Sequence, residues 1–190
     1  MRSTLLMTVA AFAMLAGCSQ PDDEALGNSA ATTNQVLPIT DNAANAAEAT
    51  TASLPTQAVP KDRAAAFMHE RHEKYEAIGD AMKIVSRELK SDNPDLAAVR
   101  ENAAKFAAFA PQVPSLFPPG SGPEAGKTMA KAMIWQKPDD FVAKAKDFAA
   151  AAKLFNAAAQ GSDVAAIRAA HGTMGKTCKA CHDLYREEHH

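Results

Sequence analysis

Apolar side chains recur at steps of three and four residues along four stretches of the chain after residue 60. The first stretch, from about Lys61 to Lys90, places these residues on one stripe: Met68, Arg71, Tyr75, Ile78, Met82, Val85 and Leu89. Steps of three and four keep side chains on one face of an α-helix. The pattern therefore predicts a helix that is buried along this face.

The same spacing predicts three further helices. The second follows Asn93 and Pro94, a natural cap and first-turn pair, the third begins at about Pro138, and the fourth follows Ser162, a good N-cap residue. Their stripes are Leu96, Val99, Ala103, Phe106 and Ala110; Phe141, Ala145, Phe148, Ala152, Phe155 and Ala159; and Val164, Ile167, His171, Met174, Cys178, Cys181 and Tyr185. Four such stripes without strand alternation predict an all-α fold, a four-helix bundle.

A long connection separates the second and third predicted helices. Residues 111–126 hold five prolines and three glycines, and an unpatterned crossover of this length is often functional. The following residues, 127–136, predict a short helical piece that ends in Ile134 and Trp135.

The first 18 residues form a leader without this pattern. They combine one basic residue, an apolar run from Leu5 to Ala16 and a small-residue junction, which is typical of an export signal. The run is shorter than the ~20 residues of a membrane-spanning helix. Its end, Leu-Ala-Gly-Cys18, resembles the lipobox of bacterial lipoproteins, whose cysteine is lipidated. Plain secretion, with Cys18 an accidental leader residue, is the alternative.

Residues 19–60 differ from both neighbours in composition. They contain five acidic residues, no basic residue and no aromatic residue. Such a segment cannot bury enough apolar surface to offset its ordering entropy. We therefore predict three parts: a signal peptide (1–18), a flexible low-complexity tether (19–60) and a helical domain (61–190). A lipid on Cys18 would anchor this domain at a membrane.

Composition narrows the classes of function. The 190 residues carry 20 basic and 22 acidic side chains, a net charge of −2, and 47% of them are apolar. This apolar content supports a buried core. The balanced charge argues against nucleic-acid binding, which needs a large basic excess. Three cysteines are too few for a disulfide-dense scaffold.

The sequence Cys178-Lys-Ala-Cys181-His182 is the sharpest chemical signal. C-x-x-C-H is the attachment motif of c-type haem. Two thiols add to the haem vinyl groups, and the imidazole beside them ligates the iron. On a helix, Cys181 and His182 follow Cys178 by three and four residues, so all three side chains project from one face. This face is the predicted buried stripe.

Three other interpretations of the motif are weaker. A thioredoxin-type redox pair would follow a strand, and none is predicted here. A structural zinc site would need a fourth ligand, for which only His171 is conceivable and without zinc-finger spacing. A structural disulfide is disfavoured within a continuous helix. One cysteine for lipid and two for haem also account for all three cysteines.

The run Gly175-Lys-Thr-Cys178-Lys-Ala-Cys181-His182-Asp-Leu-Tyr185-Arg186 resembles the C-terminal signature of the cytochrome c′ family, the class II c-type cytochromes. The similarity covers essentially all of residues 61–190. It implies an antiparallel four-helix bundle with one haem c near one end, attached by two thioethers, and often a homodimer formed by the first two helices. Only eight residues follow His182, so any sixth iron ligand must come from upstream.

The resemblance also gives expectations for the first helix. Tyr75 stands where the family's first helix faces the distal side of the iron, so we expect five-coordinate iron with a crowded distal face; packing in the core is the alternative. Arg71 is the only charge on its stripe, and a buried cation needs a partner. A haem propionate is the expected partner, and extension into solvent is the alternative.

Further residues are expected near the haem or at the surface. Arg186 follows His182 by four residues and could tune the iron electrostatically or complement the helix end. Trp135 is expected to pack at the haem edge rather than to relay electrons. The histidines expected at the surface or rim, rather than as ligands, are His69, His72 and His171.

Two functions from different classes remain. The first is electron transfer in the periplasm through a His182-ligated haem iron, with an unidentified redox partner. The alternative is a module that binds NO or CO for buffering or sensing. No distal acid–base pair is evident, so no enzymatic activity is expected.

Overall fold

The computed structural model describes residues 53–188. The predicted signal peptide, Cys18 and residues 19–52 of the tether lie outside these residues. The elements are α1 (Ala64–Lys90), α2 (Leu96–Phe109), the 3₁₀ helix η1 (Ala110–Leu116), α3 (Met133–Gln136), α4 (Pro138–Ala159) and α5 (Val164–Tyr185). Within residues 53–188, β-structure is limited to an isolated bridge between Ala130 and Arg186.

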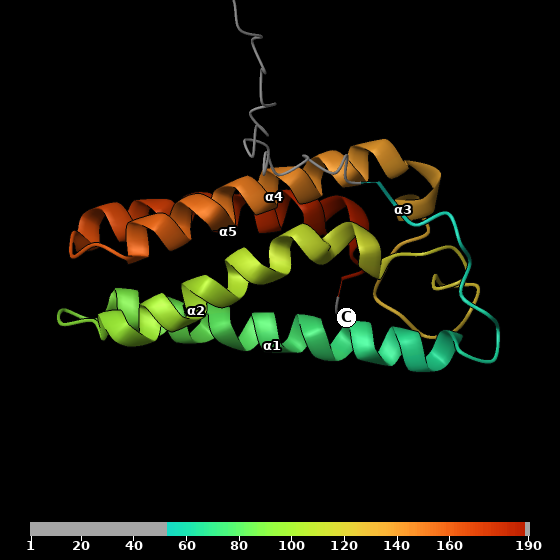
Figure 1. Cartoon of the computed structure of the whole chain (residues 1–190), viewed down its shortest axis with the longest axis horizontal. Coiled ribbons are helices and arrows are strands. Elements are labelled where there is room, and N and C mark those ends of the chain that lie inside the picture. The colour runs from blue at the N-terminus through green and yellow to red at the C-terminus, as the bar shows by residue number, and fades with distance from the viewer. Residues whose placement is uncertain (1–52, 189–190) are drawn as a thin grey trace, which may run out of the picture. The chain divides into compact units, whose positions relative to one another are not determined.

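The four long helices form the expected antiparallel bundle. α1, α2, α4 and α5 run alternately in opposite directions (Figure 1), with α1 packed on α2, α2 on α4, and α4 on α5. Near the end of α1, Arg168 of α5 donates hydrogen bonds to the carbonyl groups of Leu89 (2.8 Å) and Ser91 (3.0 Å). None of the helices in the described part of the chain is long and apolar enough to span a membrane.

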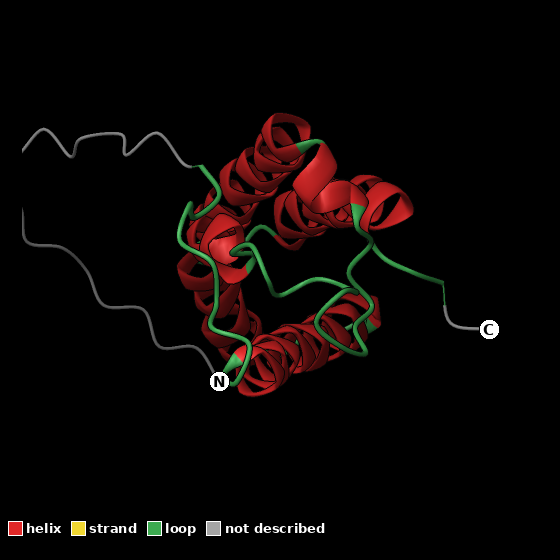
Figure 2. Cartoon of the chain, turned by 90° about the vertical axis from the view of Figure 1, so that its right-hand side faces the viewer, coloured by secondary structure: helices red, strands yellow, loops and turns green. Residues whose placement is uncertain are grey.

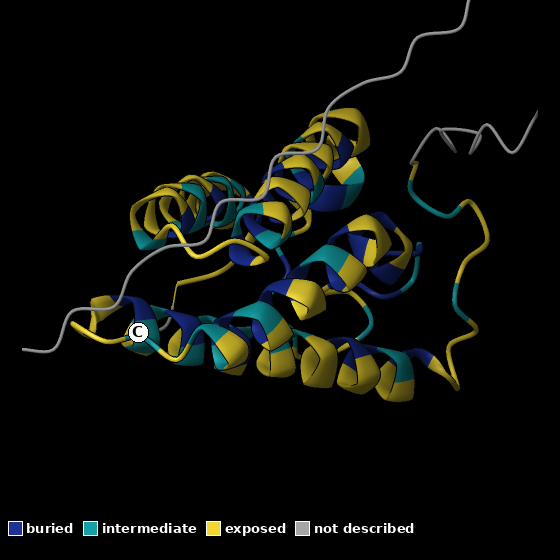
Figure 3. Ribbon diagram, turned by 60° about the vertical axis from the view of Figure 1, so that its left-hand side comes forward, coloured by how far each residue is buried: buried dark blue, intermediate teal, exposed yellow. Residues whose placement is uncertain are grey.

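The predicted stripes form the core. Figure 3 shows buried residues on the inward sides of the helices and exposed residues on the outward sides. The large side chains that are almost fully buried come from all four long helices and from α3: Val85, Val99, Phe106, Ile134, Phe141, Phe155, Ile167 and Met174. Their burial removes apolar surface from water, which is the main driving force for the packing of these helices.

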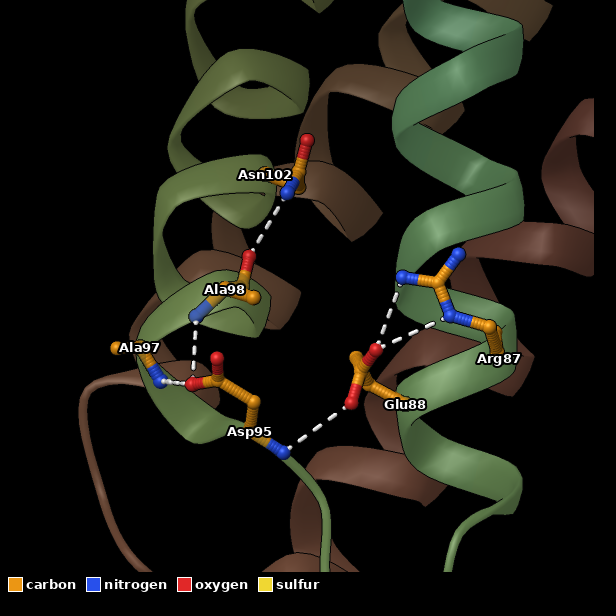
Figure 4. Close-up of polar contacts among 6 residues, drawn as sticks. All are labelled: Arg87, Glu88, Asp95, Ala97, Ala98 and Asn102. Carbon is orange, nitrogen blue, oxygen red and sulfur yellow. Dashed lines mark hydrogen bonds and ion pairs between the residues drawn. The ribbon is translucent and has the colours of Figure 1, made fainter.

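Two helix starts differ from the prediction by one or two residues. α2 is capped by Asp95 rather than Asn93, since the Asp95 carboxylate accepts hydrogen bonds from the N–H groups of Ala97 (2.9 Å) and Ala98 (3.1 Å; Figure 4). α5 is capped in the same way by Asp163 rather than Ser162. A carboxylate satisfies these free N–H groups and also interacts favourably with the positive end of the helix dipole. α4 begins at Pro138, as predicted.

The long crossover is more regular than its composition indicates, because its first residues form η1. Loop segments lie at the end of the bundle that faces the viewer in Figure 2. Residues 53–60, assigned above to the tether, have defined contacts: the N–H of Val59 donates to the carbonyl of Pro119 (2.8 Å), and Leu54 packs against the core. The domain therefore begins earlier than residue 61.

Candidate haem site

The two motif cysteines lie on the inner side of α5. Cys178 and Cys181 are half-buried, pack against the hydrophobic core and are free thiols. Burial raises the pKa of the Cys178 thiol, and burial together with the neighbouring Cys178 raises the pKa of Cys181 to about 11. Both sulfurs are therefore held as thiols at the surface of the core.

His182 occupies the next position of the same helix, but its side chain is exposed to solvent, so the prediction that all three motif residues share the buried face is wrong for His182. Partial desolvation of the ring, followed by the positive charge of Arg186, lowers the pKa of His182, while Asp183 opposes this effect. The imidazole is therefore neutral at neutral pH, with a nitrogen lone pair available for a metal. Arg186 itself follows the last turn of α5, and its N–H donates to the carbonyl of His182 (3.0 Å).

Tyr75 of α1 lies near the two cysteines. Burial raises the pKa of Tyr75 far above its usual range, and Cys181 and Cys178 add to the increase while Arg71 opposes it. The ring packs edge-on against Phe109 (5.1 Å between centroids) and Phe117 (6.2 Å). Tyr75 is thus a neutral phenol held by aromatic neighbours on the side of the core that faces the motif.

Arg71 lies one turn before Tyr75, and only 5% of its surface is exposed. Its Nη1 donates to the carbonyl of Leu116 (3.2 Å) and to Oγ of Ser121 (3.0 Å), and its Nη2 donates to the carbonyl of Ser121 (2.8 Å) and to Oγ1 of Thr128 (3.1 Å). Burial lowers the pKa of Arg71, while Tyr75 and Glu124 oppose this effect. Because Arg71 is buried, its side chain does not extend into solvent. The oxygens that accept its hydrogen bonds are all uncharged.

Phe117 of the crossover joins Trp135 and Phe141, both named in the sequence analysis, in one aromatic cluster. The Phe117 ring lies under the Arg71 guanidinium (4.8 Å) and contacts the rings of Trp135 (6.1 Å) and Phe141 (4.9 Å). Trp135 Nε1 donates to the carbonyl groups of Phe117 and Pro118, both at 3.1 Å. A Cβ at Gly122 would lie 2.8 Å from the Trp135 ring, so this close approach requires glycine. Trp135 therefore fastens the crossover to α3.

The remaining histidines lie away from this cluster. His69 and His72 are exposed and face Glu73 and Glu76, one turn further along α1, at 4.0 Å. His171 is half-buried, with Nε2 3.1 Å from Sδ of Met82 and its ring 5.5 Å from that of Phe155. Residues 53–188 contain no group of three or more His, Cys, Asp or Glu side chains that could hold a metal ion.

Another pair of residues that the sequence did not identify as a site lies at the end of α5. The Tyr185 hydroxyl donates to the Asp140 carboxylate of α4, and Asp140 also raises the pKa of Cys181. Tyr185 belongs to the predicted stripe, but no sequence signal pairs it with a residue 45 positions earlier.

The donor set of α5 fits a covalently attached haem c. It provides two free thiols at the core surface and, on the next position, an imidazole open to a metal. Thioether attachment needs thiols that are not consumed by a disulfide, and axial ligation needs a neutral imidazole. The cysteines pack against the hydrophobic core, as a large hydrophobic ring system requires, while the charged side chains of Asp140 and Lys144 act on Cys181.

Comparisons with known proteins give a consistent result. A family model described as Cytochrome C′ matches residues 66–186. The cytochrome c′ of Pararhodospirillum photometricum is 38% identical over 122 residues, which cover 64% of this chain and 97% of that protein. The cytochrome c′ of Rhodospirillum rubrum is 32% identical over 124 residues, covering 65% and 84% of the two chains.

Solved structures resemble the domain as well. The cytochrome c′ of Thermochromatium tepidum superposes with a TM-score of 0.61 at 27% identity, covering 70% of this chain and all (100%) of the other. The cytochrome c prime of Shewanella frigidimarina superposes with a TM-score of 0.59 at 32% identity, covering 66% and 97% of the two chains.

Proposed function

The chain belongs to the cytochrome c′ family and is a c-type haem protein with one covalent haem c, and on this premise we propose that it transfers electrons through this haem. The observation that carries the proposal is the placement of Cys178, Cys181 and His182 on consecutive turns of α5, near the half-buried Tyr75. When bound, the haem supplies an iron that alternates between the ferric and ferrous states.

The protein's own residues have distinct proposed roles in holding this group. Cys178 and Cys181 would form the two thioethers, and His182 would ligate the iron. Arg71 binds a haem propionate; the support is a buried cation whose hydrogen-bond partners are all neutral oxygens, so its charge can still pair with an anion. Arg186 acts electrostatically on His182, since its charge lowers the pKa of that residue. Trp135 packs at the haem edge.

Binding of NO or CO is a second candidate function, favoured by Tyr75. A phenol whose pKa is raised by burial stays protonated, and a protonated phenol is a poor iron ligand. Tyr75 would then crowd the distal side of the iron without binding to it. With His182 as its protein ligand, the haem iron would have a free position for a small diatomic ligand.

The remaining proposals concern place and assembly. Residues 1–18 act as an export signal, Cys18 carries a lipid, and residues from 19 to the domain tether it in the periplasm near a membrane. The support is the leader sequence and its Gly-Cys end. We also propose that the protein is a non-enzymatic electron carrier with an unidentified redox partner. Two copies of the protein can form a homodimer through α1 and α2.

Covalent attachment tests the central proposal. Cys178→Ala combined with Cys181→Ala should abolish the haem that survives acid–acetone extraction, whereas Cys18→Ser, which removes the third cysteine, should retain it. Covalent haem in the double variant would refute the proposed attachment.

A spectrum of the reduced protein, recorded without and with CO, distinguishes the two functions. A broad high-spin spectrum that changes on addition of CO supports an open iron and ligand binding. Sharp low-spin bands that do not respond to CO would leave electron transfer as the function.

A further inference from the structure

We propose that Tyr185 and Asp140 form a positioning pair that fixes the last turn of α5 and thereby orients His182. The inference rests on the proposed ligation by His182. It assigns a role to an interaction between α4 and α5 that neither helix needs for its own formation.

The pair joins the C-terminal end of α5 to the N-terminal end of α4. Because the two helices are antiparallel, these ends lie at the same end of the bundle. Tyr185 is the last residue of α5 and is only 3% exposed, and its ring packs edge-on against Phe141 with 5.2 Å between centroids. Its hydroxyl donates to the carboxylate of Asp140 in the first turn of α4. A carboxylate is favoured at this end of a helix because the dipole is positive there. Asp140 is thus a well-stabilised acceptor for a buried phenol.

The backbone adds further ties at the same place. The carbonyl of Tyr185 accepts a hydrogen bond from the N–H of Lys131 (2.9 Å), and the N–H of Glu187 donates to the carbonyl of Met129 (2.8 Å). Helix ends normally fray because their last carbonyl groups lack partners within the helix. Here the end of α5 is held on one side by residues 129–131 and on the other by Asp140.

His182 depends on these ties because it lies in the turn that they hold. It precedes Tyr185 by three residues, and its carbonyl accepts the N–H of Arg186 at 3.0 Å. Its side chain is exposed, so core packing does not set the ring direction. The backbone of the last turn, which the Tyr185–Asp140 contact holds, therefore sets the direction of the Cα–Cβ bond of His182 and so the position from which the imidazole would reach the iron.

The negative charge of Asp140 also acts on Cys181, one of the two proposed attachment residues. Asp140 raises the pKa of Cys181, and Lys144, one turn further along α4, opposes this effect. A carboxylate at this place favours the more positive, oxidised form of a nearby redox centre. Removal of its charge should therefore raise the reduction potential.

Three variants of the full-length holoprotein test the proposal. Tyr185→Phe removes the hydroxyl but keeps the ring that packs on Phe141. Asp140→Asn removes the charge and weakens the acceptor. Asp139→Asn is the matched control, because Asp139 is an exposed carboxylate in the same helical turn. The measurements are the iron–histidine stretching band of the ferrous protein by resonance Raman, the midpoint potential and the amount of covalent haem.

We expect Tyr185→Phe and Asp140→Asn to shift the iron–histidine band to lower frequency and to broaden it, and Asp140→Asn also to raise the midpoint potential. Asp139→Asn should leave the band unchanged. A lower unfolding temperature with a wild-type band in both test variants would show a merely structural contact and overturn the proposal. If Tyr185→Phe does not fold, Asp140→Asn decides alone. Absence of covalent haem from the wild-type protein would instead refute the proposed function.

Discussion

Arg71 and Tyr75 show how two residues one turn apart on α1 can serve the same site in different ways. The buried guanidinium of Arg71 donates hydrogen bonds to Ser121 of the crossover and to Thr128, which follows the crossover. Tyr75 interacts electrostatically with the motif cysteines, and its ring packs against Phe109 and Phe117. In the proposed site, Arg71 pairs with a haem propionate and Tyr75 crowds the distal side of the iron.

Substitution of Tyr75 should change the access of ligands to the iron. Tyr75→Ala removes the ring that crowds the distal position, so CO affinity should rise. Tyr75→Met offers a thioether and should move the iron toward low spin. CO titration and absorption spectra of the reduced proteins measure both effects. An unchanged CO affinity in Tyr75→Ala would place the phenol away from the ligand.

Substitution of Arg71 should destabilise the crossover and shift the reduction potential. Arg71→Leu preserves the apolar stripe but leaves the carbonyl groups of Leu116 and Ser121 without their donor. An unsatisfied buried acceptor costs ~1–3 kcal/mol, so we expect a loss of at least about 2 kcal/mol in the free energy of unfolding. Urea unfolding measures the loss, and circular dichroism should show retained helix.

The propionate proposal for Arg71 has its own control. Arg71→Lys keeps a positive charge but cannot reproduce the forked contacts. If Arg71→Leu shifts the midpoint potential and Arg71→Lys does not, the charge acts on the haem. Equal potentials in all three proteins would limit Arg71 to the crossover.

At the scale of elements, the caps of α2 and α5 decide where these helices begin. Asp95→Ala and Asp163→Ala should each reduce the free energy of unfolding by ~1 kcal/mol, because two N–H groups lose their acceptor. Asn93→Ala and Ser162→Ala are matched controls from the same loops and should have smaller effects. Urea unfolding of the four variants measures the difference; the reverse order would contradict the observed caps.

His171 links three helices and should make stability depend on pH. Its ring on α5 contacts Met82 of α1 and Phe155 of α4, and burial lowers its pKa below the ordinary value of 6.5. The unfolded chain therefore takes up a proton first as the pH falls. The stabilising contribution is complete above the ordinary value and is lost progressively as the pH falls toward the folded pKa.

Comparison with His171→Gln isolates this effect from that of other groups, including His182. The difference in unfolding free energy between the two proteins should decrease as the pH is lowered from about 8 to about 5. Urea unfolding at several pH values measures it. A difference independent of pH would show that His171 does not titrate in this range.

At the scale of the whole molecule, the proposed anchor at Cys18 determines where the domain works. Cys18→Ser should release the protein from the membrane fraction into the soluble periplasm, because a lipid supplies the apolar anchor. Fractionation of cells that express either form measures the change. Equal solubility of the mutant and wild-type proteins would favour plain secretion.

The periodic pattern alone determined the number of long helices and most of the residues that they bury. These features depend on contacts between residues three or four positions apart, so they are encoded locally. The same local information left the first residue of α2 and α5 uncertain. Asn93 and Ser162 are acceptable caps by type, and only the observed hydrogen bonds assign that role to Asp95 and Asp163.

Only the tertiary structure decided which residues meet across the bundle. Arg71 contacts Ser121 and Thr128 from 50 and 57 positions away, and Tyr185 meets Asp140 from 45 positions away. No periodicity connects such residues, because their proximity depends on how the crossover folds back and on how α4 and α5 align. The sequence therefore determined what chemistry α5 carries, and the packing of the other helices determined which side chains surround it.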